Sequence, residues 1–317
     1  MRAVTIVDGA LQWRERPDPA PGNGELLVRV RAAGLNSADL MQVAGFYPAP
    51  TGSPPDIPGL ELAGDVVAVG DGVHRFSIGD RVMAIVGGGA QAELALVHER
   101  TAIPVPERLE WPEAGGFPEA FTTAHDALFT QCGLSLGERA CVHGAAGGVG
   151  IAGVQLALAA GAEVVATVRN EDLRAAVSAF GAEVVVPADF IAHGPFDVIL
   201  ELVGGPNLPG DLASLATGGR IAVIGVGGGA AAELDLLALM GKRGRIHGST
   251  LRARPLEQKA IAAHLVETHV LPLVERGTVK VPVDATYPMA EAAAAYERFA
   301  AGGKLGKIVL VNPSNLG

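Results

Sequence analysis

The segment from Glu138 to Asn170 constrains the fold of this chain more than any other; it reads ERACVHGAAGGVGIAGVQLALAAGAEVVATVRN. A short apolar run is followed by glycines, then by a long run without charge and a second β-branched run. This order predicts a strand, a tight turn, a buried helix and another strand. Because two strands joined by a helix form a right-handed βαβ unit, we expect a parallel sheet here.

Alternating strand and helix patterns continue over residues 118–252. The strands expected after the first helix are AEVVATV, AEVVVPA, FDVILELV, RIAVIGVG and RIHGST. Helices are expected between them, including GDLASLATGG, but VVVPADFIAHGPFDVIL is too short to hold a full one. The alternation predicts an α/β fold with a doubly wound parallel sheet, whose ligands bind at the carboxyl ends of the strands.

The rest of the chain has a different texture. Residues 1–117 contain short Val-, Ile- and Leu-rich runs between Gly-, Pro- and Asp-rich turns, which predicts a partly open barrel or a sandwich. After Arg252 we expect one helix over PLEQKAIAAHLVETHVLPLVERG, then a strand, a helix and the final strand GKIVLV. From pattern alone, this tail either extends the parallel sheet or returns to the first domain.

Composition limits the class of protein. Hydrophobic residues make up 49% of the 317 residues and charged residues 18%, which favours a large core over disorder. The net charge of −10 argues against a nucleic-acid surface. The pattern of apolar runs predicts neither a membrane span nor a signal sequence, and two cysteines cannot build a disulfide framework. We therefore expect a soluble protein of the reducing cytoplasm.

The glycines match the dinucleotide-binding pattern G-x-G-x-x-G in the register Ala145, Gly147, Gly150. Gly147 lets the backbone approach a pyrophosphate, and Gly150 lets the helix pack against the strand. The helix N-terminus offers unpaired N–H groups and a partial positive charge to phosphate. We predict that the backbone of this turn binds a dinucleotide. The turn residues are Ala146, Gly147, Gly148 and Val149.

The end of the next strand predicts which dinucleotide is bound. NAD sites usually carry Asp or Glu there to hold the ribose 2′-hydroxyl, but this strand ends at Arg169. A guanidinium suits a 2′-phosphate, which it grips with two parallel hydrogen bonds. Arg174, one helical turn further on, adds charge. We therefore predict NADPH as the cofactor.

Several motifs spread over nearly the whole chain together resemble one family. They are AAGLNSADLMQVAGFYP, PGLELAGDVVAVG, SIGDRVMA, AAGGVGIAGVQLA, KRGRIHGSTLRAR and GKLGKIVL. The family is the zinc-free quinone oxidoreductase (zeta-crystallin-type) branch of the medium-chain dehydrogenase/reductase superfamily. The resemblance implies a GroES-like β-barrel catalytic domain, residues 1–117 and 253–317, with a Rossmann domain, residues 118–252, inserted in it. It also points to a homodimer joined at the edge of the Rossmann sheet, which an unpaired edge strand favours.

Zinc members of the superfamily carry ligands that this chain lacks. Asn36 stands at the position of their catalytic cysteine and Leu60 at that of a histidine, while Glu61 is retained. Asparagine with leucine cannot supply a tetrahedral zinc site, so we expect no metal. Without a Lewis acid, the substrate should accept hydride readily, as a quinone does. We predict an NADPH-dependent quinone oxidoreductase. The alternatives are an NADPH-dependent enoyl or alkenal reductase and a non-catalytic NADPH-binding protein.

The resemblance places Asn36 and Tyr47 at the substrate cleft as catalytic residues. Tyr47 then hydrogen-bonds the substrate carbonyl or relays a proton through water, the alternative being a ring packed beside Pro48. Asp39 is expected to cap the adjacent helical turn, and His143 to have a structural role.

The resemblance also implies cofactor contacts outside the glycine turn. They are Thr122, Arg169, Asn170, Gly225, Val226, Ser249, Thr250, Leu251 and Lys304. Close relatives use Ser, Lys and Tyr around the 2′-phosphate, whereas Asn170 and Leu173 occupy the first two positions here and VVVPADF holds no tyrosine. Arg169 is therefore expected to compensate.

Overall fold

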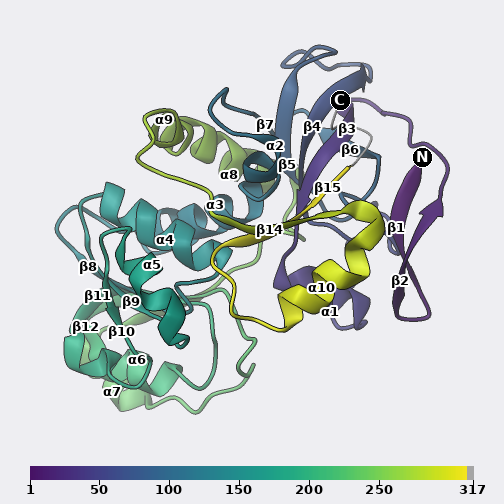
Figure 1. Cartoon of the computed structure of the whole chain (residues 1–317). Coiled ribbons are helices and arrows are strands. Elements are labelled where there is room, and N and C mark those ends of the chain that lie inside the picture. Colours follow the sequence, from purple (N-terminus) through teal and green to yellow (C-terminus); the bar gives the residue numbers. More distant parts are fainter. Residues whose placement is uncertain (313–317) are drawn as a thin grey trace. The chain divides into compact units, whose positions relative to one another are not determined.

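The computed structural model describes residues 1–312, shown in Figure 1, so the last five residues of the predicted segment 253–317 lie outside the described residues. The chain divides into two compact units. One contains Met1–Glu119 together with Leu251–Gly317, and the other contains Ala120–Thr250. Within residues 1–312, no helix combines the length and the apolar character needed to cross a membrane.

The middle unit is built on a parallel sheet with the order β10-β9-β8-β11-β12-β13. Its strands are β8 (Arg139–Val142), β9 (Glu163–Thr167), β10 (Glu183–Val185), β11 (Phe196–Glu201), β12 (Leu215–Val223) and β13 (Arg245–Gly248). The strand order runs outward from β8 in one direction and from β11 in the other. This is the doubly wound arrangement that the sequence predicts, and its switch point lies between β8 and β11.

Helices lead into these strands and connect them. They are α3 (Pro118–His125) with the π-helix η1 (Asp126–Gln131), α4 (Gly148–Ala159), η2 (Glu171–Leu173), α5 (Arg174–Ser178), η3 (Phe190–His193), α6 (Leu208–Ser214) and α7 (Leu236–Lys242). The crossover from β10 to β11 holds only the 3-10 turn η3, as its short length predicts. One boundary was predicted wrongly: the helix expected over GDLASLATGG ends at Ser214, because Leu215 already pairs with Phe196 of β11.

The unit formed by the two chain ends has a second sheet. Its strands are β3 (Glu25–Gly34), β4 (Glu61–Val69), β5 (Arg81–Ile85), β6 (Leu94–His98), β7 (Ala102–Pro104), β14 (Val283–Pro288) and β15 (Lys307–Val311). Among residues 1–312 the strand pairs follow an open path, β14-β15-β3-β4-β5-β7, with β6 against β3. Because β15 pairs with β3, the C-terminal tail returns to the first sheet, as the resemblance implies.

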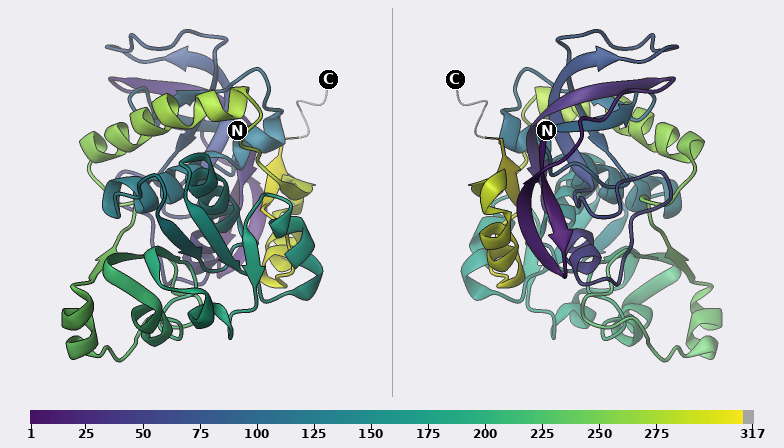
Figure 2. Two further views of the ribbon diagram at one scale, coloured as in Figure 1. Left: turned by 90° about the vertical axis from the view of Figure 1, so that its left-hand side faces the viewer. Right: turned by 90° about the vertical axis from the view of Figure 1, so that its right-hand side faces the viewer.

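The remaining elements surround this sheet. They are the hairpin of β1 (Arg2–Val7) and β2 (Ala10–Glu15), drawn purple in Figure 2, and α1 (Ser37–Val43), α2 (Trp111–Gly115), α8 (Leu256–His269), α9 (Leu271–Glu275), η4 (Met289–Glu291) and α10 (Ala292–Ala300). The single helix expected after Arg252 is two helices. Pro272 lies at the start of α9 and has no N–H to continue the hydrogen bonding of α8.

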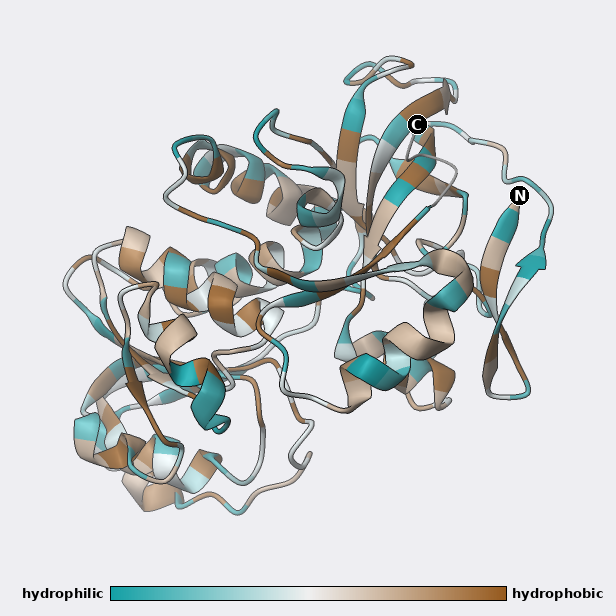
Figure 3. Cartoon of the chain, viewed as in Figure 1, coloured by the Kyte–Doolittle hydropathy of each residue, from teal (hydrophilic) through white to brown (hydrophobic). Residues whose placement is uncertain are grey.

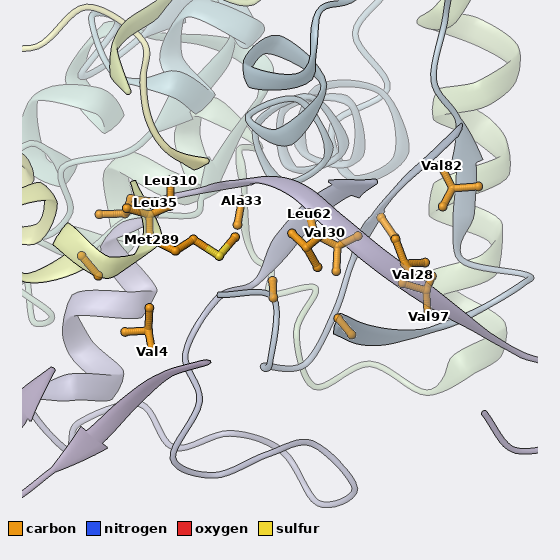
Figure 4. Close-up of a cluster of buried hydrophobic side chains, with 14 of the residues drawn as sticks. Val4, Val28, Val30, Ala33, Leu35, Leu62, Val82, Val97, Met289 and Leu310 are labelled. Carbon is orange, nitrogen blue, oxygen red and sulfur yellow. The ribbon is translucent and has the colours of Figure 1, made fainter. Parts of the chain in front are cut away.

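The alternation of side chains along the strands builds the core of this unit. Figure 3 shows hydrophobic and hydrophilic residues alternating along the strands of this sheet. Val28 and Val30 of β3 pack with Leu62 of β4, and Leu310 of β15 joins the same cluster (Figure 4). Apolar burial of this kind contributes roughly 25 cal/mol per Å². It fixes the ends of β3, β4 and β15, where polar residues gather.

Candidate functional site

The glycine turn has the local geometry that dinucleotide binding requires. Gly147 is the N-cap of α4, and Ala146 to Val149 are partly exposed. Gly150 is buried, and a Cβ atom there would lie 2.5 Å from the carbonyl oxygen of Gly144. Only glycine therefore lets α4 approach the turn. Since the first four amides of a helix have no intrahelical acceptor, this end of α4 attracts an anion.

The loop after β9 places a cation beside this turn. The amide of Ala145 donates to the carbonyl oxygen of Thr167 at 3.2 Å, which ties the glycine turn to the end of β9. Arg169 follows two residues later with an exposed side chain. Arg174 donates from Nε to the carbonyl of Val168 at 3.2 Å and from Nη2 to that of Arg169 at 3.3 Å. It thus braces the loop that carries Arg169.

Asn170 has a local partner in the same loop. Its Oδ1 accepts from the amide of Asp172 at 3.1 Å and so caps η2. The side-chain amide nitrogen remains the part of Asn170 suited to a further contact.

The other predicted cofactor residues of this unit lie on three elements. Thr122 of α3 is buried, and its hydroxyl has no hydrogen-bond partner among the described residues. Gly225 and Val226 follow β12, and a Cβ at Gly225 would lie 2.3 Å from the carbonyl oxygen of Leu202. Ser249, after β13, donates to Asp126 Oδ2 at 3.1 Å, and Thr250 follows it. The loops after β12 and β13 therefore lie together at the carboxyl edge of the parallel sheet.

A buried polar network lies beneath the glycine turn. His143 Nε2 is 2.9 Å from Asp211 Oδ1, and its Nδ1 is 3.0 Å from Thr167 Oγ1. Glu201 Oε2 lies 3.9 Å from the same Nε2. Burial opposes protonation of His143, but hydrogen bonds and charge interactions with Asp211 and Cys141 together outweigh it and raise the histidine pKa to about 10. The imidazolium then donates from both nitrogens.

These three side chains also have the residue types of a metal site. The ligand atoms of His143, Glu201 and Asp211 lie within 4.8 Å of one another. Both ring nitrogens of His143, however, already have protein partners, Asp211 and Thr167. The cluster therefore acts as a hydrogen-bonded brace between β8, β9 and α6. The predicted structural role of His143 agrees with this geometry, whereas nothing in the sequence pattern singled out Glu201 or Asp211.

A second polar cluster lies in the unit formed by the chain ends. Lys307 Nζ donates to Glu61 Oε1 at 2.6 Å, to Asn36 Oδ1 at 2.7 Å and to the carbonyl of Leu35 at 2.9 Å. Asn36 Nδ2 in turn donates to Glu61 Oε1 at 2.9 Å. The ammonium thus has an acceptor for each of its three protons. Asn36 is largely occupied by protein partners, which makes it a bridge between Lys307 and Glu61.

Asp39 caps α1 as predicted. Its Oδ2 accepts from the amide of Asn36 at 2.8 Å, and its Oδ1 accepts from the amide of Gly59 at 3.1 Å. Burial raises the pKa of this carboxyl to about 7. Asp39 thus fixes the backbone that presents Asn36.

Tyr47 follows α1 on a loop and is half-buried. The Arg252 guanidinium carbon lies 5.0 Å from the centroid of its ring, and Nη1 of Arg252 donates to the Tyr47 carbonyl at 3.0 Å. Burial raises the pKa of Tyr47, so its hydroxyl stays protonated at neutral pH. Arg252 lies in the motif KRGRIHGSTLRAR, but no role was predicted for it.

Leu251 and Lys304 are the predicted cofactor residues of the chain-end unit. Leu251 is buried. Lys304 Nζ lies 4.4 Å from the centroid of the Phe299 ring and donates to the carbonyl of Gly306 at 3.3 Å. Burial, aided by the charge of Lys307, lowers the pKa of Lys304 to about 8. This amine is therefore protonated at neutral pH.

Two family models match the chain. The model of the alcohol dehydrogenase GroES-like domain matches residues 22–107, and that of the zinc-binding dehydrogenases matches residues 160–310. The rat quinone oxidoreductase is 34% identical over 306 residues, which cover 92% of this chain and 91% of the rat protein.

Solved structures of other proteins resemble this one over nearly its whole length. An alcohol dehydrogenase superfamily protein from Novosphingobium aromaticivorans is 28% identical with a TM-score of 0.87, covering 98% of this chain and 99% of that protein. A mycobacterial protein complexed with NADPH is 26% identical with a TM-score of 0.86, covering 98% of this chain and all of that one (100%).

The residues at the expected metal positions do not fit zinc. Leu60 has no donor atom and Asn36 offers only an amide, so Glu61 is the one strong ligand among these three positions. The Lys307 ammonium already occupies the facing oxygens of Asn36 and Glu61. The chain itself therefore supplies the cation at these positions, which is the Lys307 ammonium.

Proposed function

Because this chain belongs to the medium-chain dehydrogenase/reductase superfamily, in its quinone oxidoreductase branch, we propose that it is an NADPH-dependent quinone oxidoreductase. The chain is an oxidoreductase with a nicotinamide cofactor, and we propose that this cofactor is NADPH and the acceptor a quinone. The observation that carries it is the exposed Arg169, two residues after β9, in a loop whose strand is tied to the glycine turn by the hydrogen bond from Ala145 to Thr167. The NADPH in the mycobacterial relative supports the same cofactor.

The two units have different tasks in this proposal. The middle unit, within the predicted range 118–252, forms the dinucleotide-binding domain, and the chain-end unit, which includes residues 1–117 and 253–317, forms the catalytic domain. Amides at the start of α4 bind the pyrophosphate, and Arg169 with Asn170 binds the 2′-phosphate. The buried Thr122 hydroxyl, which has no partner among residues 1–312, gives the cofactor one more hydrogen bond. The further cofactor positions are Gly225, Val226, Ser249, Thr250, Leu251 and Lys304.

The chain's own residues handle the acceptor. NADPH, when bound, supplies a hydride to the substrate. Tyr47 donates its protonated hydroxyl toward the oxygen that gains negative charge, or relays a proton to it through water. Asn36 is held by Lys307 and Glu61, so it keeps the positive charge of the Lys307 ammonium at the start of α1. No step passes through a metal, since the donor set at these positions does not fit one.

A quinone is the acceptor class that suits this machinery best. Its reduced oxygens are weak bases, so they need little acid assistance, whereas the enolate from an alkenal is more basic and needs a stronger donor. A single phenol hydroxyl is therefore adequate for a quinone.

We place the protein in solution as a homodimer in the cytoplasm. Strand β13 lies at one edge of the parallel sheet, and α7 exposes Leu237 by 79% and Met240 by 70%. An edge strand beside exposed apolar side chains favours pairing with a second copy. The thiols of Cys132 and Cys141 are both free and buried, which suits a reducing compartment.

An acceptor screen tests this function. The purified protein is given NADPH or NADH with 1,4-benzoquinone or a 2-alkenal, and coenzyme oxidation is followed by absorbance. We expect the highest kcat/KM for NADPH with the quinone. Preference for the alkenal would favour the enoyl or alkenal reductase, and binding of NADPH without turnover of any acceptor would favour a binding protein.

A further inference from the structure

Arg252 links three segments of the chain-end unit. It is 3% exposed. Its Nε donates to the carbonyl of Gly87 at 2.8 Å, its Nη1 to that of Tyr47 at 3.0 Å, and its Nη2 to Gln42 Oε1. Gly87 lies in the loop after β5, Tyr47 in the loop after α1, and Gln42 in α1 itself. One side chain therefore sets the spacing between segments that are far apart in sequence.

The same guanidinium lies against the Tyr47 ring. Its carbon is 5.0 Å from the ring centroid, a distance at which a cation is attracted by the aromatic face. The Tyr47 backbone and ring are thus held by one residue, while its hydroxyl has no hydrogen-bond partner within residues 1–312. Restraint of the ring leaves the hydroxyl available to a ligand.

The chemistry of the contacts argues against a purely stabilising ion pair. The three acceptors of Arg252 are neutral oxygens, two carbonyls and one amide. A buried cation without a carboxylate in this set costs desolvation energy that an apolar side chain would avoid. What arginine adds is a rigid planar fork that reaches several acceptors at fixed angles, which lysine cannot reproduce.

Gln42 extends the restraint to the rest of the loop. It is 5% exposed, and its Nε2 donates to the carbonyl of Pro55 at 3.2 Å while its Oε1 accepts from Arg252. Both ends of the segment from Tyr47 to Pro55 are therefore tied to Arg252, one directly and one through Gln42.

We propose that Arg252 is a positioning residue for Tyr47, which fixes the ring so that its hydroxyl meets the oxygen of the bound acceptor. This inference rests on the proposed function of Tyr47 in acceptor reduction. Arg252 itself does not contact the acceptor. Its contribution reaches the reaction only through the placement of Tyr47.

A double-mutant cycle tests this. The variants are Tyr47→Phe, Arg252→Met, Arg252→Lys and both arginine changes combined with Tyr47→Phe. Arg100→Met is the matched control, because Arg100 pairs with Glu257 at the start of α8 and lies outside the proposed machinery. For each variant we measure kcat and KM with 1,4-benzoquinone, the Kd of NADPH and the thermal unfolding midpoint.

We expect Arg252→Met to lower kcat about as much as Tyr47→Phe, roughly tenfold, and the double variant to lose no more than Tyr47→Phe alone. The NADPH Kd should stay within about twofold, because neither side chain is placed at the cofactor. Arg252→Lys should have a higher kcat than Arg252→Met when Tyr47 is present. When each change is combined with Tyr47→Phe, the two double variants should have the same kcat. Arg100→Met should leave kcat unchanged.

Losses that multiply in the double variant would overturn the inference, and so would an unchanged kcat in a folded Arg252→Met protein. If Arg252→Met fails to fold, the cycle with Arg252→Lys decides in the same way. If the wild-type protein does not oxidise NADPH with any of the acceptors, this result would instead contradict the proposed function. The two failures are therefore distinguishable.

Discussion

The ammonium of Lys307 lies 2.6 Å from Glu61 Oε1, with side-chain exposures of 5% and 0%. Both residues also bind Asn36, so the three side chains form a closed hydrogen-bonded set. In this set a lysine provides the positive charge between Asn36 and Glu61, and its position is fixed by β15 pairing with β3.

Replacing Lys307 by methionine should destabilise the protein. It leaves the buried Glu61 charge without its partner, and breaking a buried pair in this way costs about 3–5 kcal/mol. Denaturant unfolding measures the loss. The double variant Glu61→Gln with Lys307→Met should recover part of it, because no buried charge is then left unpaired. A loss below about 1 kcal/mol for Lys307→Met would show that the pair is dispensable.

The purified protein should contain no stoichiometric zinc. The Lys307 ammonium already uses the oxygens of Asn36 and Glu61, and Leu60 offers no donor. Elemental analysis of protein washed with a chelator checks this, with turnover measured before and after the wash. One zinc per chain, or activity that disappears with the wash, would contradict this assignment of the cluster.

The Arg169→Ala variant should lose NADPH affinity selectively. A charge-assisted hydrogen bond contributes about 1.5–3 kcal/mol, so the Kd of NADPH should rise roughly ten- to a hundredfold while that of NADH changes little. Calorimetric titration with each coenzyme measures both values. Arg14→Ala, at an exposed arginine of β2, is the control. Equal weakening of both coenzymes would mean that Arg169 does not read the 2′-phosphate.

The arrangement along β8 and β9 could be predicted because its signals are local. Gly150 has to be glycine because of atoms five and six residues earlier in the chain, so the pattern carries the geometry. The short crossover between β10 and β11 was likewise readable from length alone. The end of α6 was not, because pairing of Leu215 with a neighbouring strand decides it.

The polar networks could not be predicted for the same reason. Lys307 and Asn36 are separated by 271 residues, and Arg252 and Tyr47 by 205. Hydrophobic periodicity places each residue on an element but says nothing about which distant polar groups meet. Lys307 stood in the quoted motif GKLGKIVL as a family signature without a role, and Arg252 stood in the same way in GSTLRAR.

The homodimer should depend on α7. Replacing both Leu237 and Met240 by glutamate puts charge on the apolar face beside the sheet edge, which disfavours burial against a second copy. Light scattering at micromolar concentration should give a dimer for the wild type and a monomer for this variant. Ile261→Glu, at an exposed position of α8, should remain a dimer. A wild-type monomer would contradict the proposal.

Hydride transfer from NADPH to a quinone without a metal is the central claim, and one measurement tests it most directly. Chelator-treated protein is mixed with 1,4-benzoquinone and NADPH that carries deuterium at the transferred position, and single-turnover oxidation is followed. We predict one NADPH consumed per quinone reduced, at an unchanged rate after chelation and more slowly with the deuterated coenzyme. Oxidation that stops after chelation, or NADPH that stays bound and unoxidised, would contradict it.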